Sequence, residues 1–255
     1  MLFINLVQAN LKTRLLGQKI EYYTRLESTN SEAWELIREG AKSGTLVVTD
    51  NQFKGKGRED RVWSSAPDKG ITFSLVLFTE LEAKLSGWFP ILTGVAVHKA
   101  LSSFHSIPML KWPNDLILGG KKVGGILCES KVKHNRLHKV VIGVGLNVNE
   151  TIEDFDVDLR FSATSMHIHA SKFYQRERVL AEILNNLEPL IDGLPNNLKL
   201  IKSQWESTCD HLGSSLQFHN QNSIVKGVFK SLGSSGSAII DVDGENTEFH
   251  SAEIS

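Results

Sequence analysis

The chain has 255 residues, enough for one or two domains with a large core. Its 28 basic and 29 acidic residues leave a net charge of −1, which argues against nucleic acid or an anionic membrane as a partner attracted by overall charge. The two cysteines, Cys128 and Cys209, lack CxxC spacing, so we expect a protein of the reducing cytoplasm with no zinc site or other resident metal.

The first residues lack the basic and apolar pattern of a secretion signal, and no apolar run is long enough to cross a bilayer. Thr29-Asn30-Ser31-Glu32 has the form of a capping box, and apolar residues follow at helical spacing, so a helix is expected over 30–39. Short apolar runs predict strands at 45–49, 71–78, 110–112 and 139–148, and helical periodicity predicts a helix at 87–104.

Two glycines at 119–120, between the strand-like runs 116–118 and 123–129, indicate a β-hairpin. An acidic connection, 149–163, precedes two predicted helices at 172–191 and 196–207. After Cys209 the composition changes, and short strands separated by turns are predicted at 216–219, 223–231, 238–242 and 246–250. We therefore expect a first domain over 1–210 and a small β-barrel domain over 211–255.

The stretch from Gln52 to Ser65 has the most unusual composition in the chain. It combines two glycines that permit close backbone approach, one tryptophan and four cations: Lys54, Lys56, Arg58 and Arg61. A mobile backbone with cations and an aromatic ring suits a ligand that carries both phosphate and a ring. A solvated basic loop is the alternative, since short charged runs usually have no further role.

Four further segments accompany this loop: Glu27-Ser28-Thr29-Asn30, Lys111-Trp112-Pro113-Asn114-Asp115-Leu116, the run K-V-G-G-I-L-C-E at 122–129, and the run V-I-G-V-G-L-N-V at 141–148. In this order and spacing they resemble the biotin–protein ligases, over nearly the whole chain. The resemblance implies an α+β fold, with a mixed β-sheet and flanking helices as in class II synthetases. It also implies that the C-terminal domain is an SH3-like barrel.

The resemblance also implies a two-step, ATP-dependent reaction that forms biotinyl-AMP and then biotinylates a lysine of the biotin carboxyl carrier protein of acetyl-CoA carboxylase. Biotin and ATP are the implied substrates, and Mg²⁺ is the implied metal ion. Arg58 and Lys122 are the implied catalytic residues, because fixed cations cancel the repulsion between a carboxylate and a polyphosphate. The biotin site is assigned to Ser28, Thr29, Asn30, Gln52, Lys56, Gly57, Arg58, Lys122 and Gly125. The adenylate site is assigned to Gly55, Lys56, Arg58, Arg61, Trp63, Lys111 and Asn147.

Each assignment has a simpler alternative. Ser28, Thr29 and Asn30 are common helix-capping residues, and an isolated lysine such as Lys122 is usually solvated. Trp63 is equally suited to a core, and Asn147 to the end of a strand. Glycines inside strands, such as Gly125, Gly143 and Gly145, indicate close approach by a ligand or a neighbouring backbone. Trp112, Pro113 and Asp115 are expected to be mainly structural, and Cys128 to be a packed thiol.

Two loop residues depart from the family pattern. Lys56 replaces an arginine, which keeps the charge but loses the bidentate geometry, and Asp60 replaces a glycine. About 26 residues precede the 27–30 segment, too few for the DNA-binding domain of the family's repressors, so we expect a ligase without repressor function. The alternatives are a lipoate–protein ligase, a catalytically inactive biotin sensor and a nucleic-acid-binding module. The expected oligomeric state is a monomer or a homodimer.

Overall fold

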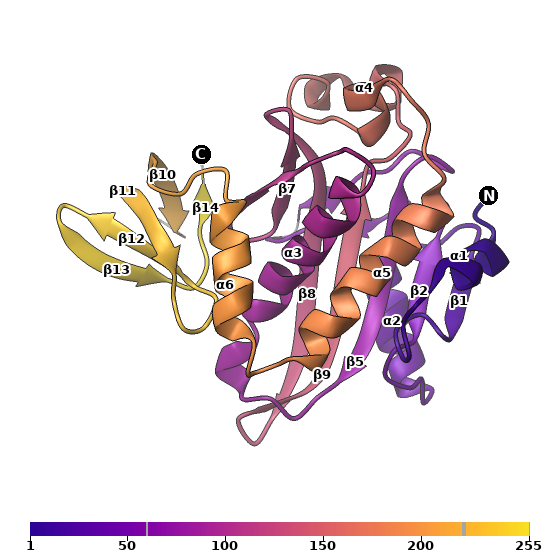
Figure 1. The fold of residues 1–255 in the computed structure, drawn as a ribbon, viewed down its shortest axis with the longest axis horizontal. Helices are drawn as coiled ribbons and strands as arrows, with labels where there is room; N and C mark the ends of the chain where they lie inside the picture. The colour runs from indigo at the N-terminus through magenta and orange to yellow at the C-terminus, as the bar shows by residue number, and fades with distance from the viewer. Residues whose placement is uncertain (60, 221–222, 255) are drawn as a thin grey trace.

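The computed structural model describes residues 1–59, 61–220 and 223–254. Its larger part is a seven-stranded mixed sheet with the strand order β1-β2-β5-β9-β8-β7-β6 (Figure 1). The strands are β1 (Ile20–Tyr23), β2 (Leu46–Thr49), β5 (Ile71–Phe78), β6 (Met109–Lys111), β7 (Asp115–Leu118), β8 (Lys121–Lys133) and β9 (Arg136–Leu146). Strands β1 and β2 are parallel, whereas all other neighbours in this sheet are antiparallel.

The helices are α1 (Ile4–Asn10), α2 (Thr29–Arg38), α3 (Trp88–Ser102), α4 (Met166–Ala170), α5 (Arg176–Asp192) and α6 (Leu198–Ser207). Figure 1 shows α3 and α5 side by side on one face of the sheet, with α1 beside α5 and α6 beside α3. Helix α2 packs against β2, β5 and β9. Within the described residues, no helix has the length and apolar content needed to span a membrane.

The alternation of side chains along the central strands separates the two faces of the sheet. In β5, Phe73, Leu75 and Leu77 belong to the main core beneath α3 and α5, and Val76 packs in a smaller cluster with α2. The intervening Thr72 and Ser74 point to the α2 side. Ser74 is fully buried against the first turn of α2, whereas Thr72 lines a cavity on this side of the sheet.

A second, five-stranded antiparallel sheet has the order β13-β12-β11-β10-β14. Its strands are β10 (Ser215–Asn220), β11 (Ser223–Leu232), β12 (Ala238–Val242), β13 (Glu245–Phe249) and β14 (Glu253–Ile254). It lies beside α6, at the end of the molecule opposite β1 (Figure 1). The indole N–H of Trp112 donates to the carbonyl of Gly236 at 3.1 Å, so the motif that begins at Lys111 contacts the turn between β11 and β12.

The predicted fold class is confirmed: a mixed sheet with flanking helices precedes a small C-terminal β-domain. The structure contains the two helices predicted at 30–39 and 87–104, and it contains the hairpin predicted at Gly119-Gly120. The helix predicted from residue 172 begins at Arg176, and the 149–163 connection contains two short 3₁₀ helices, Ile152–Asp154 and Val157–Leu159. The boundary at 210/211 stays a prediction, because one hydrophobic cluster includes residues of both sheets.

The sequence did not predict α1, β1 and α4, nor the two-residue strands Gly55–Lys56, Val62–Trp63 and Glu253–Ile254. Strand β1 is an edge strand whose four residues are all half-buried, so it shows no alternation of polar and apolar residues. Helix α4 has five residues, too few to show helical periodicity. It contains His167 and His169, and the His167 ring stacks on Phe173 with 4.2 Å between centroids.

Candidate active site

A cavity of about 190 Å³ lies on the open face of the large sheet, between α2, strands β8 and β9 and the loop after Gln52. We call it the central cavity. Its floor follows from strand register: Thr72 of β5 pairs with Gly145 of β9, and Gly145 pairs with Gly125 of β8. Because these two paired glycines have no side chains, a ligand or another side chain can approach the backbone of the sheet at this point.

One end of the central cavity is a chain of short polar side chains at the start of α2. Ser28 is the N-cap of the helix, and its hydroxyl accepts from the Ser31 N–H at 3.5 Å. The Thr29 N–H donates to Oε1 of Gln52 at 2.8 Å. The Ser74 hydroxyl lies 2.8 Å from Oγ1 of Thr29 and 2.6 Å from Oδ1 of Asn30. Capping and cavity lining therefore coincide in the same residues.

The glycines of β9 are required by these neighbours. A Cβ added at Gly143 would lie 2.1 Å from Oδ1 of Asn30, and one added at Gly145 would lie 2.3 Å from the Trp63 ring. Both positions thus admit no larger residue without displacing a cavity residue. A Cβ at Gly125 would meet the Lys122 side chain at 3.6 Å, an ordinary contact. Close approach to these glycines was predicted from a ligand or a neighbouring backbone, whereas at Gly143 and Gly145 the approaching groups are side chains of the protein itself.

The basic loop forms a short hairpin over the cavity, with β3 (Gly55–Lys56) paired to β4 (Val62–Trp63). Gly55 lies opposite Trp63, and a Cβ there would be 2.2 Å from the Trp63 carbonyl oxygen, so this pairing requires glycine. Beyond it, the Gly57 N–H donates to the Arg61 carbonyl at 2.7 Å and tightens the turn. Asp60, at which the sequence departs from the family pattern, lies outside the described residues.

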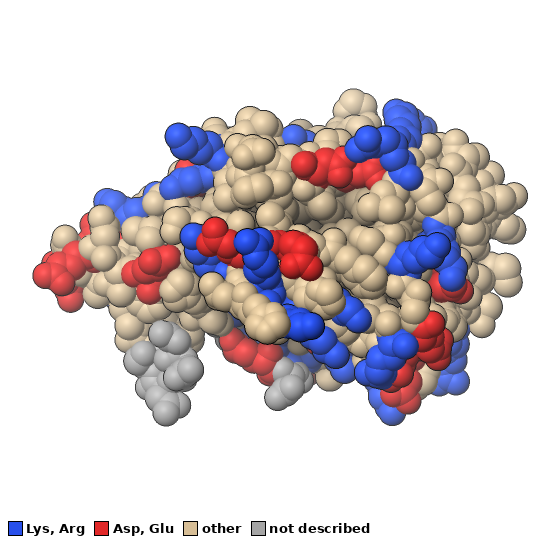
Figure 2. All heavy atoms as spheres, turned by 90° about the horizontal axis from the view of Figure 1, so that it is seen from below, with Lys and Arg blue, Asp and Glu red and all other residues tan. Residues whose placement is uncertain are grey.

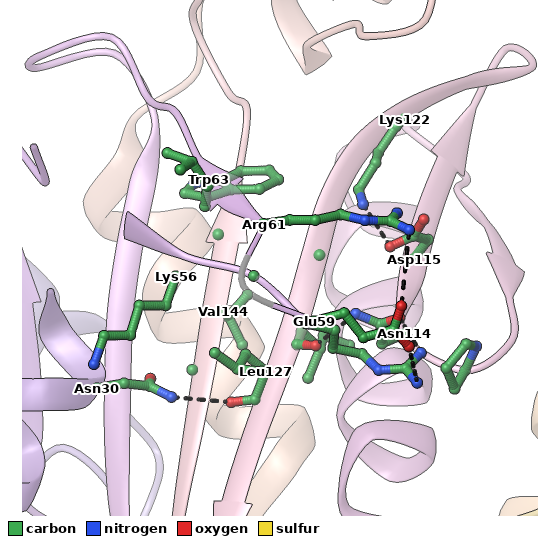
Figure 3. Close-up of a pocket in the computed structure, with 18 of the residues that line it drawn as sticks. Asn30, Lys56, Glu59, Arg61, Trp63, Asn114, Asp115, Lys122, Leu127 and Val144 are labelled. Carbon is green, nitrogen blue, oxygen red and sulfur yellow. Dashed lines mark hydrogen bonds and ion pairs between the residues drawn. The ribbon is translucent and has the colours of Figure 1, made fainter. Parts of the chain in front are cut away.

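The other end of the central cavity is cationic. Nζ of Lys122 lies 2.6 Å from Oδ1 of Asp115, and both side chains are partly exposed. Arg61 extends across the cavity toward this pair, whereas Lys56 extends toward Asn30 (Figure 3). Lys111 also lines the cavity. Cations from three separate segments of the chain are therefore grouped around one space, as binding of a polyphosphate requires.

Arg58 connects the basic loop to the second sheet. Its guanidinium donates to Oδ1 of Asn114 at 3.4 Å and to the Ser251 hydroxyl at 2.6 Å. Ala252 and Ile254 of the C-terminal segment also line the central cavity. The second sheet therefore contributes to the cavity wall, which the sequence patterns did not indicate.

Twelve of the fourteen residues predicted for the site line the central cavity. The two others are Gly55, in the β3–β4 pairing, and Asn147, whose side-chain amide donates to the Thr164 carbonyl at 3.0 Å in a buried position. Thr72, Ser74 and Asn114 were not predicted as site residues, and Asp115 was expected to be structural. The alternation of polar and apolar residues over 71–78 was a signal for Thr72 and Ser74.

The described residues do not support three other functions: metal binding, catalysis by a reactive thiol and nucleic-acid binding. Among the described residues, no group of three or more His, Cys, Asp or Glu side chains is placed to hold a metal ion. Burial raises the pKa of the Cys128 thiol well above its ordinary value, in keeping with the packed thiol that was predicted. On the face drawn in Figure 2, Lys and Arg side chains lie among Asp and Glu side chains, without the continuous basic surface typical of nucleic-acid binding.

A seven-stranded mixed sheet with flanking helices, followed by a small C-terminal β-domain, is the fold of the biotin and lipoate protein ligases. Residues 22–147 match the Biotin/lipoate A/B protein ligase family. The chain is 32% identical over 250 residues to the bifunctional ligase/repressor BirA of Bacillus subtilis, an alignment that covers 97% of this chain and 77% of that protein. The protein therefore belongs to the biotin/lipoate protein ligase family, and the resemblance seen in its motifs is confirmed.

Two further relatives extend the comparison. The biotin–[acetyl-CoA-carboxylase] ligase of Mycobacterium tuberculosis is 25% identical over 259 residues, which cover 97% of this chain and 94% of that protein. The structure of the Aquifex aeolicus biotin protein ligase in complex with biotin and ATP superposes with a TM-score of 0.77 and 27% identity. That superposition covers 93% of this chain and 98% of the Aquifex chain.

Proposed function

We propose that this protein is a biotin–protein ligase that activates biotin with ATP and transfers it to the carrier protein of acetyl-CoA carboxylase. The M. tuberculosis relative carries this activity in its name, and the Aquifex structure holds both biotin and ATP. The observation on which the proposal rests is the two-ended cavity, because Figure 3 places Asn30 at one side and Lys122 with Asp115 at the other. One cavity thus offers a ring-binding end and a phosphate-binding end.

In the first step, a carboxylate oxygen of biotin attacks the α-phosphorus of ATP, and pyrophosphate leaves. Both reactants are anions, so their approach requires fixed positive charge that remains in place in the transition state. Lys122 is held by Asp115 at 2.6 Å and Arg58 by Asn114 at 3.4 Å. We assign these two cations to the carboxylate and the α-phosphate, and we assign Arg61 and Lys111 to the remaining phosphates.

The polar end suits the ureido ring of biotin, which presents one carbonyl acceptor and two N–H donors. Ser28, Thr29, Asn30 and Gln52 supply short donors and acceptors within one hydrogen-bonded chain. We assign the purine of ATP to the surface next to Trp63, whose ring lies on Gly145. Lipoate carries a dithiolane ring without N–H donors, so this polar end favours biotin.

In the second step, the amine of a carrier lysine attacks the acyl carbon of biotinyl-AMP, and AMP leaves. Positioning and charge are the contributions that we assign to the protein in this step. Mg²⁺ fits as an ion that enters with the nucleotide, since it is usually held by phosphates and water with one or two carboxylates. Among the described residues, Asp115 and Glu59 are the carboxylates that line the cavity.

ATP–pyrophosphate exchange with purified protein tests the proposal. Biotin and lipoate are offered separately, and transfer to an isolated biotin carrier domain is followed by mass spectrometry. Exchange that depends on biotin, followed by a mass gain of one biotin on the carrier, is expected. Exchange with lipoate alone would overturn the biotin assignment, and binding of biotin without exchange would make the protein a sensor.

Two further assignments belong to the proposal. We place the protein in the reducing cytoplasm, since Cys128 and Cys209 are both free thiols. We expect it to act as a monomer or a homodimer, and light scattering with and without biotin and ATP distinguishes the two.

A further inference from the structure

Glu129, on β8 at the edge of the central cavity, accepts two hydrogen bonds from α2. Its Oε2 accepts from Nδ2 of Asn30 at 2.8 Å and from the indole N–H of Trp34 at 3.2 Å. Nζ of Lys131 lies 4.9 Å from the centre of the Trp34 ring, so Trp34 contacts both Lys131 and Glu129. Glu129 has no assigned role in the reaction proposed above. Among the described residues, its carboxylate is nevertheless the only charged group that is hydrogen-bonded to Asn30.

The Glu129 carboxylate determines which way the Asn30 amide points. Nδ2 of Asn30 lies against two groups that only accept, the carboxylate of Glu129 and the Leu127 carbonyl at 3.3 Å. With both N–H hydrogens so engaged, Oδ1 must be the atom 2.6 Å from the Ser74 hydroxyl. An amide oxygen accepts two hydrogen bonds, so Asn30 offers one further acceptor position and no donor to a ligand in the cavity.

The opposite orientation would change the chemistry of the site. If the amide were reversed, Nδ2 would face the Ser74 hydroxyl and the cavity, and Oδ1 would face a carboxylate that cannot donate to it. Oδ1 of Asn30 and the Glu129 carboxylate would then be two buried acceptors facing each other, and the folded state would bear the free-energy cost of an unsatisfied polar group. Asn30 is only 4% exposed, so water cannot readily relieve that penalty.

We propose that Glu129 is a positioning residue for ring specificity. It fixes the Asn30 amide so that Oδ1 receives a ring N–H of the substrate, and the site thereby selects a cyclic urea over an acid whose ring lacks N–H. This inference rests on the proposed biotin ligase function and deepens it. It makes biotin recognition depend on a residue beyond the side chains that line the central cavity.

The first test compares Glu129→Ala with Trp34→Phe, which removes the other donor to Glu129 and leaves Asn30 bonded. Pyrophosphate exchange is measured with biotin and with biotin methylated on a ureido nitrogen. For Glu129→Ala we expect the KM for biotin to rise at least about fivefold with kcat within about twofold, and the preference for biotin over the N-methyl analogues to fall by a similar factor. Trp34→Phe should keep both values near wild type.

The second test exchanges the amide of Asn30 and the carboxylate of Glu129 between the two positions. Asn30→Asp places two carboxylates against each other, and we expect it to weaken biotin binding by more than about tenfold. Adding Glu129→Gln restores a donor at 129 facing an acceptor at 30, so the double variant should recover most of the lost affinity. Thermal unfolding of every variant separates loss of fold from loss of recognition.

The outcomes distinguish this inference from the proposed function. A wild-type protein without biotin-dependent exchange would contradict the proposed function itself. A functional wild type, combined with a Glu129→Ala variant that keeps both its biotin KM and its preference over the N-methyl analogues, would overturn only the role of Glu129. A double variant no better than Asn30→Asp alone would overturn it as well.

Discussion

The ammonium group of Lys122 lies 2.6 Å from Oδ1 of Asp115, across the hairpin formed by β7 and β8. The register of these strands shifts between Leu116 and Ile117, where Ile117 pairs with Lys122 and Leu116 pairs with Gly124. This irregularity brings side chains from two sequence motifs, 111–116 and 122–129, to the same side of the sheet. Asp115, expected to be structural, therefore also holds the cation to which we assign catalysis.

The first prediction concerns Lys122→Ala. Because the variant removes fixed positive charge where a carboxylate must meet the α-phosphate, we expect biotin-dependent pyrophosphate exchange to slow by roughly tenfold or more. Lys121→Ala is the matched control, since Nζ of Lys121 bonds to the Arg160 carbonyl at 3.3 Å and does not line the central cavity. Equal rates for the two variants would argue against the catalytic assignment of Lys122.

The second prediction concerns Gly145→Ala. The added methyl group would lie 2.3 Å from the Trp63 ring, so the ring and the β3–β4 hairpin must move. We expect weaker ATP binding by calorimetry, by about tenfold, with a smaller change in thermal stability. In the Gly145→Ala/Trp63→Ala double variant the clash is absent, so the two changes should be non-additive. Strictly additive effects would show that Trp63 does not mediate the loss.

The sequence predicted the elements that have a strong local signal. The helix predicted from the Thr29–Glu32 pattern and the hairpin predicted from Gly119-Gly120 both depend on neighbouring residues, and both are present. The capping box itself was wrong, because Ser28 is the N-cap and Thr29 is already the first residue of the helix. The contact of Arg58 with Ser251 joins residues 193 positions apart, and no local pattern encodes such a pairing. Asn30 and Gly143 are also far apart in the sequence, and they pack against each other in the structure. The sequence indicated only that a glycine lies within a predicted strand, and it did not indicate which residue packs against it.

The third prediction concerns the pH dependence of stability. Glu150 is 1% exposed, and neither oxygen of its carboxyl group has a hydrogen-bond partner among the described residues, so burial raises its pKa from 4.5 to about 7. Since the folded state binds the proton more tightly than the unfolded state, this contribution to stability is fully present below pH 4.5 and is lost as the pH rises through 7.

Glu150→Gln removes this titration. Relative to wild type, we expect the variant to gain up to about 3 kcal/mol in free energy of unfolding between pH 5 and pH 8. Urea unfolding of both proteins at several pH values measures the difference, in which the other titrating groups cancel. A stability difference that is independent of pH would show that Glu150 does not titrate in this range.

The fourth prediction is that biotin and ATP together protect the basic loop from trypsin. Lys54, Lys56 and Arg58 are potential cleavage sites, and the loop carries cations that a bound polyphosphate would engage. We expect cleavage at these sites to slow by at least about fivefold with both ligands, which corresponds to a shift of about 1 kcal/mol in the local opening equilibrium. Lys133 and Arg136, at the tip of the β8–β9 hairpin, are exposed and away from the central cavity, so they serve as internal controls. Protection of the loop and the hairpin tip to the same extent would indicate global stabilisation by the ligands instead of closure of the loop over them.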